Sequence, residues 1–194
     1  RDACPRCSGG AASIRMRTAR VCGWAPARAM SSEGRIVLLY APEELNSWTI
    51  AELAALPDGE DESHEYKSSK TPFDALKTKL SCAASAFWNS GGGLFVGGVD
   101  NAGRVDGGIS TVVNREPLQD WVDRVVASVA PRARYRVAVV NAEADKGVLL
   151  VAFEESHLAP HMASDGRYYV RAGAHTERAS AFIVEALFAR RGLS

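Results

Sequence analysis

The chain has 194 residues, 46% of them hydrophobic and 24% charged, which is an ordinary composition for a globular protein. This length allows one domain with a proper core and little more. No stretch approaches the roughly 18 apolar residues that a membrane helix needs, so no membrane span is expected. The 23 basic and 23 acidic residues cancel, which excludes the strong overall positive charge of many nucleic-acid-binding proteins.

The balanced total hides an uneven distribution along the chain. Residues 1–29 carry six arginines and one aspartate, and the rest of the chain carries 17 basic and 22 acidic residues. Cys4 and Cys7 form a lone CxxC without the second pair that a zinc ribbon needs, and the Arg-rich segment lacks the amphipathic stripe of a transit peptide. We therefore predict a disordered or non-native leader over 1–29, an arm and helix over 30–59, and one cytoplasmic domain over 60–194.

Apolar spacing and turn residues predict strands and helices in alternation after residue 30. In chain order, strands are expected over 35–40, 63–69, 94–99, 105–108, 135–140, 147–153 and 166–171, and helices over 47–56, 73–88, 115–130 and 179–190. Helix starts are placed at the hydroxyl caps Ser47 and Thr71, and the glycine block after Asn89 ends the second helix. The interspersed pattern predicts an α/β or α+β fold in which a mixed β-sheet has flanking helices.

Three acidic residues are candidates for a metal site. Glu60 and Glu65 leave one segment, and Asp100 stands where a buried strand meets its turn. Two or three carboxylates together with substrate phosphate oxygens are the usual ligands of Mg²⁺ or Mn²⁺ at sites that cleave phosphodiesters. Lys67 and Arg171 are expected to supply positive charge for the phosphate.

The same residues have a second interpretation that needs no ligand. Glu60 belongs to an acidic turn of the kind that solvent covers, Lys67 fits a solvated strand position, and Asp100 is a common turn former. Spacing alone favours this interpretation over the metal site.

A later segment combines basic and aromatic side chains, which suits a groove for a phosphate backbone with base stacking. If it is a strand, Arg167, Tyr169 and Arg171 share one face and Tyr168 lies on the other. That face is either a nucleic-acid contact, extended by Arg178, or an ordinary solvated face. The glycine block at 91–93 matches neither common nucleotide-loop pattern, and Cys82 has no neighbouring base that would make it a nucleophile.

Several short motifs in a fixed order resemble the Schlafen AlbA-type domain. They are listed in chain order: Glu60-x4-Glu65-Tyr-Lys, a helix ending in Phe87-x-Asn89, a glycine block, a buried strand, Gly98-Val-Asp100, and Tyr168-Tyr-x-Arg171-x-Gly173. The resemblance spans about 60–180. Two residues depart from it: Tyr66 stands where the family usually has Phe, and His64 where an apolar residue is common.

The resemblance implies a nucleic-acid-handling domain. Vertebrate Schlafens use related modules as metal-dependent endoribonucleases with two glutamates and one aspartate, which correspond to Glu60, Glu65 and Asp100 here. Bacterial members are often described as ATP-binding or as transcriptional regulators. The expectation is thus an RNA- or DNA-binding domain, either a Mg²⁺/Mn²⁺-dependent RNase or a non-catalytic regulator or ATP-binding module, and a homodimer by analogy.

Overall fold

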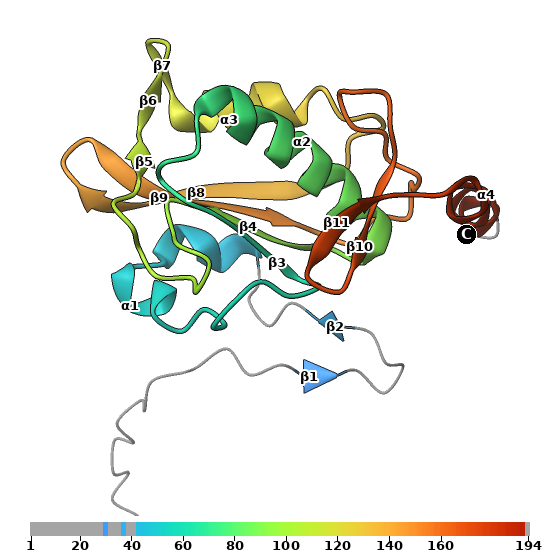
Figure 1. Ribbon diagram of the computed structural model, residues 1–194, viewed down its shortest axis with the longest axis horizontal. Helices are drawn as coiled ribbons and strands as arrows, with labels where there is room; N and C mark the ends of the chain where they lie inside the picture. The colour runs from blue at the N-terminus through green and yellow to red at the C-terminus, as the bar shows by residue number, and fades with distance from the viewer. Residues whose placement is uncertain (1–28, 31–35, 38–41, 193–194) are drawn as a thin grey trace, which may run out of the picture.

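The computed structural model describes residues 29–30, 36–37 and 42–192 (Figure 1). The helical elements are η1 (Pro42–Ser47, a 3-10 helix), α1 (Ile50–Leu53), α2 (Phe73–Ser90), α3 (Leu118–Val126) and α4 (Ala181–Arg191). The strands are β1 (Ala29–Met30), β2 (Ile36–Val37), β3 (His64–Lys67), β4 (Gly93–Gly97), β5 (Ile109–Ser110), β6 (Val112–Val113), β7 (Glu116–Pro117), β8 (Tyr135–Glu143), β9 (Lys146–Phe153), β10 (Tyr169–Ala172) and β11 (His175–Arg178). The leader predicted over 1–29 lies almost wholly outside the described residues.

A five-stranded mixed sheet forms the centre of the domain. Its order is β3-β4-β9-β5, with β8 pairing along the other side of β9. Strands β3 and β4 run parallel, while β9 is antiparallel to β4, β5 and β8. A parallel pair needs a crossover connection, and α2 supplies it between β3 and β4. The predicted fold, an α+β domain with a mixed sheet and flanking helices, is confirmed.

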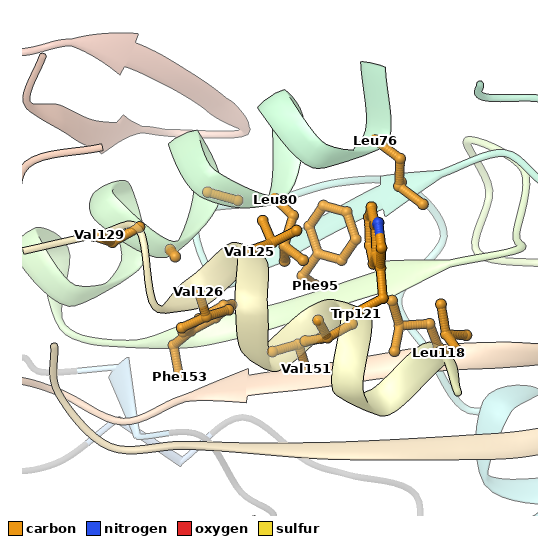
Figure 2. Packing of buried hydrophobic residues seen from close by; sticks show 14 of the residues in the cluster. Leu76, Leu80, Phe95, Leu118, Trp121, Val125, Val126, Val129, Val151 and Phe153 are labelled. Atoms are coloured by element: carbon orange, nitrogen blue, oxygen red, sulfur yellow. The ribbon is translucent and has the colours of Figure 1, made fainter. Parts of the chain in front are cut away.

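Helices cover both faces of this sheet, and each face has its own core (Figure 1). On one face, α2 and α3 pack Leu80 and Trp121 against Phe95 and Phe153 (Figure 2). On the other face, Leu45 of η1 and Leu53 of α1 pack on the sheet. Residues before Glu60 therefore contribute to the core of the domain.

The glycine block that ends α2 acts as the sequence predicts. Gly91 takes a left-handed conformation with φ of 102°, which a residue with a side chain seldom adopts, and Gly92 N–H bonds the Phe87 carbonyl at 2.8 Å. A Cβ on Gly93 would lie 2.1 Å from the Phe87 ring, so β4 can start directly beneath the helix end only with glycine there.

Helix starts were the weakest part of the sequence prediction. The first helix is only Ile50–Leu53 and is capped by Thr49 rather than Ser47, because Thr49 and Glu52 form a reciprocal capping box. No side chain caps α2, whose N-cap is Pro72 rather than Thr71. The predicted helix over 115–130 begins at Leu118.

Three further segments differ from the prediction. Asn114 and Arg115 have φ of 51° and 71°, and they form the two-residue turn of the β6–β7 hairpin in place of a helix start. The return strand expected at 105–108 is reduced to a single bridge between Val99 and Val105. The strand expected over 166–171 begins at Tyr169 and forms a hairpin with β11.

The last helix is present, but its apolar face is not buried as its periodicity predicted. Ser180 caps α4, and Leu187 is its buried residue, whereas Phe182 is 77% exposed. None of the helices in the described ranges is long and apolar enough to cross a membrane.

Candidate functional site

Edge strand β3 presents two of the predicted site residues on one face. Glu65 and Lys67 alternate with Tyr66, whose ring packs in the core on the opposite face. Glu60 reaches this strand from the preceding segment, and its Oε1 accepts hydrogen bonds from the Tyr66 backbone N–H at 2.7 Å and from Lys67 Nζ at 3.0 Å. The Glu60 side chain thus occupies the outer edge of β3, which β4 leaves unpaired.

The ammonium group of Lys67 lies between the two glutamates. Its Nζ is 3.0 Å from Glu60 Oε1 and 2.7 Å from Glu65 Oε1, and it also donates to the Tyr66 carbonyl at 2.6 Å. The side chains of Lys67 and Glu65 are 16% and 9% exposed. Burial by itself would raise the pKa of Glu65, but the positive charges of Lys67 and Arg171 outweigh it and hold that pKa below its usual value.

Arg171 of β10 adds a second cation to the cluster and approaches it from the β10–β11 hairpin. Its side chain is 2% exposed. The guanidinium pairs with Glu65 and donates to Thr176 Oγ1 and to the carbonyls of Ala174, His64 and Asp61. The guanidinium carbon also lies 5.0 Å from the centre of the Phe87 ring, within cation–π range. These donors connect the hairpin to β3, and the contact of Arg171 with a phosphate stays a prediction.

Asp100 does not join this cluster. Its Oδ1 accepts the backbone N–H groups of Ala102 and Arg104, both at 2.9 Å, as in a turn stabilised by an aspartate. Asp106 of the same loop contacts the segment after β3 instead, where its carboxylate accepts from Ser68 Oγ at 2.6 Å and from Ser69 N–H at 3.0 Å.

The described residues do not fit a three-ligand metal site in this arrangement. Among them, no three His, Cys, Asp or Glu side chains are grouped so as to hold a metal ion. Glu60 and Glu65 are brought together, but Lys67 lies between them and Asp100 is engaged in its own turn. The assignment of Glu60, Glu65 and Asp100 as metal ligands therefore stays a prediction.

The other residues predicted to bind nucleic acid lie on or beside the β10–β11 hairpin. Arg167 is exposed and 3.9 Å from Asp165, and Arg178 is exposed beside Tyr169, its cross-strand neighbour. Tyr169 donates its hydroxyl to Asp165 at 2.7 Å, and burial followed by this hydrogen bond raises the pKa of Tyr169. Arg167 and Arg178 are therefore better placed for an incoming anion than Tyr169.

Sequence reasoning missed a buried polar group that positions this hairpin. Asn89 donates to the carbonyls of His161 and Tyr169 at 3.0 and 2.9 Å, and its Oδ1 accepts the His161 N–H at 2.7 Å. Ser85, one turn earlier in α2, accepts the Tyr169 N–H at 3.1 Å. Asn89 belongs to the Phe87-x-Asn89 motif on which the family resemblance is based. The sequence therefore pointed to this residue, but it did not indicate that Asn89 holds the hairpin in place.

A pocket of about 490 Å³ lies away from the charged cluster, between α1 and the loop that follows β4. Its lining combines apolar side chains such as Ile50 and Val105 with the charged Asp58 and Arg104. None of the predicted site residues lines it.

Three comparisons with known proteins were made. A crystal structure of the DIP2311 protein from Corynebacterium diphtheriae is similar, with 17% identity, a TM-score of 0.48, and coverage of 71% of this chain and 26% of that one. This chain thus spans about a quarter of that protein. A search of curated proteins found no match. The sequence model of the family described as Schlafen, AlbA_2 matches residues 60–180, which is more than half of the chain. The chain therefore belongs to the Schlafen AlbA_2 family.

Proposed function

We propose that this domain binds nucleic acid. The supporting observation is that a family associated with nucleic acids coincides here with exposed cations, Arg167 and Arg178, at the hairpin beside the Lys67 cluster. Exposed guanidinium groups pair well with phosphate oxygens, and such contacts provide most of the affinity for a nucleic-acid backbone.

Binding is tested by fluorescence anisotropy with labelled single-stranded RNA and DNA of the same sequence over a range of salt concentrations. We expect affinity to fall as salt rises, since phosphate contacts release bound counterions. Absence of binding to both strands at low salt would refute the proposal. A complex that is insensitive to salt would also argue against it.

We propose cleavage of RNA with Mg²⁺ or Mn²⁺ as a second, narrower function. It follows from the acidic residues that the family resemblance points to, of which Glu60 and Glu65 lie close together, although Lys67 separates them. A divalent ion at this place would have to replace the Lys67 ammonium and recruit a third ligand, and the released Lys67 would be available to a phosphate. When bound, such an ion supplies positive charge to the phosphate and an activated water.

The test incubates purified protein with tRNA and Mn²⁺ alongside Glu65→Gln and Asp100→Ala. We expect cleavage by the unaltered protein and a loss of at least tenfold in each variant. Cleavage by all three proteins alike, or by none, would remove this second function and leave the binding proposal unaffected. Chelation with EDTA is the matched control for a contaminating metal-independent nuclease.

A further inference from the structure

Three arginines lie in alternation at the other edge of the sheet. Ala133, Tyr135 and Val137 pack against the core formed with α2 and α3. Because side chains alternate along an extended chain, Arg134 and Arg136, which lie between these residues, point to the opposite face. Arg132 precedes Ala133 and continues the alternation. Arg132 and Arg134 come just before β8, Arg136 lies within it, and all three are exposed.

Their charges are not neutralised by acidic neighbours. Within the described part of the chain, no acidic side chain forms an ion pair with any of the three, although Arg124, Arg167 and Arg171 each have one. Glu154 is next to Arg134 in the strand pairing, but the bond between them is from the Glu154 backbone N–H to the Arg134 carbonyl at 3.2 Å. Among the described residues, the row therefore consists of exposed arginines without an ion-pair partner.

The backbone beneath the row is held in place. The Arg134 carbonyl also accepts a hydrogen bond from the buried Trp88 indole N–H at 3.0 Å, and the Pro131 carbonyl contacts the His161 ring. Only the arginine side chains would need to be ordered by a ligand, which limits the entropic cost of binding.

We propose that Arg132, Arg134 and Arg136 form a track for the phosphates of a single-stranded nucleic acid, an inference that rests on the proposed binding function. Residues two apart in an extended chain are spaced by about 6.6 Å, so side chains on one face of this segment are expected at a regular spacing. An extended strand with regularly spaced phosphates matches such a row, and sequence-independent binding follows from contacts to the backbone.

The track is separate from the Lys67 cluster. Strand β8 and strand β3 are at opposite edges of the sheet, with β4 and β9 between them. Arg136 also shares its face with Ala138, in the core under η1 and α1, whereas Glu65 and Lys67 are on the other face. Binding along the track therefore does not require Glu60 or Glu65.

The test replaces all three arginines by glutamine and measures binding of single-stranded RNA and DNA by anisotropy. We expect affinity at low salt to fall at least tenfold and the slope of log affinity against log salt to decrease by about 2, at roughly 0.7 per lost phosphate contact. Replacing the same residues by lysine should preserve the slope. The matched control, Lys77, Lys79 and Lys146 to glutamine, removes equal charge from exposed positions elsewhere and should have a much smaller effect.

The possible outcomes distinguish the proposed track from the proposed binding function. Unchanged binding by the arginine-to-glutamine variant would overturn the track while leaving the binding function intact, and so would an equal loss in the lysine control. If the unaltered protein binds neither RNA nor DNA, the function and the track fail together. Far-ultraviolet circular dichroism of each variant verifies that it is folded.

Discussion

The two edges of the central sheet carry similar numbers of cationic side chains, which are buried and paired at one edge and exposed at the other. At the β3 edge, Lys67 and Arg171 are largely buried and paired with carboxylates and carbonyls. At the β8 edge, Arg132, Arg134 and Arg136 are exposed, and no acidic side chain among the described residues pairs with them. The difference shows that residue type alone does not identify the cations available to a polyanion. Burial and partners determine that availability.

The sharpest test of the buried edge is Arg171→Met. This substitution leaves Glu65 buried with one cation fewer and removes one donor from each of three carbonyls, so we expect a loss of about 3–5 kcal/mol in the free energy of unfolding. Urea titration measures it. The control is Arg178→Met, an exposed position on the adjacent strand that should cost less than about 0.5 kcal/mol. Equal losses would contradict the buried role of Arg171.

The acid dependence of stability gives a second difference between the edges. The pKa of Glu65 in the folded protein lies below its ordinary value of 4.5, so the ionised form is favoured by folding. This contribution is fully present above about pH 4.5 and is lost as the pH falls through the lower folded pKa. We expect Glu65→Gln to flatten the decline of the melting temperature in acid. The glutamine variant of the β8 arginines should retain the decline of the unaltered protein.

A smaller effect is expected for Lys67→Met. The ammonium is 16% exposed and has two carboxylate partners, so its removal leaves two acids facing each other and should cost about 1–2 kcal/mol. If a divalent ion competes with Lys67 for these carboxylates, the variant should also gain stability in Mn²⁺. A melting temperature that does not respond to Mn²⁺ would argue against a metal between Glu60 and Glu65.

The sequence predicted the elements whose local and tertiary signals agree. Helix α2 and hairpin β8–β9 were recognised because their apolar patterns coincide with burial on the sheet. The apolar pattern of α4 did not coincide with burial, and the start of α3 was displaced because the turn at Asn114 and Arg115 has no unambiguous signature. Local patterns cannot specify which surface of an element the rest of the chain will cover.

The sequence also predicted only that part of the candidate site which depends on local structure. Glu60, Glu65 and Lys67 are close in sequence, and their convergence follows from one strand and the segment before it. Arg171 is more than a hundred residues from Glu65 along the chain, so its burial depends on the packing of the hairpin against α2. The alternation of Arg132, Arg134 and Arg136 was visible in the sequence, but their lack of acidic partners was not.

Asp100 offers the smallest and most discriminating prediction, because its two interpretations make different demands on the side chain. As a turn former it needs only an oxygen that accepts the N–H groups of Ala102 and Arg104, which asparagine also provides. Asp100→Asn should therefore change the free energy of unfolding by less than about 0.5 kcal/mol, whereas Asp100→Ala should cost about 1 kcal/mol. As a metal ligand it needs the negative charge, so Asn would abolish Mn²⁺-dependent cleavage while leaving stability nearly unchanged. Unfolding and cleavage measured on the same two variants therefore distinguish the two roles of Asp100. Only loss of cleavage in an Asp100→Asn variant of unchanged stability would mean that Asp100 leaves its turn to bind a metal.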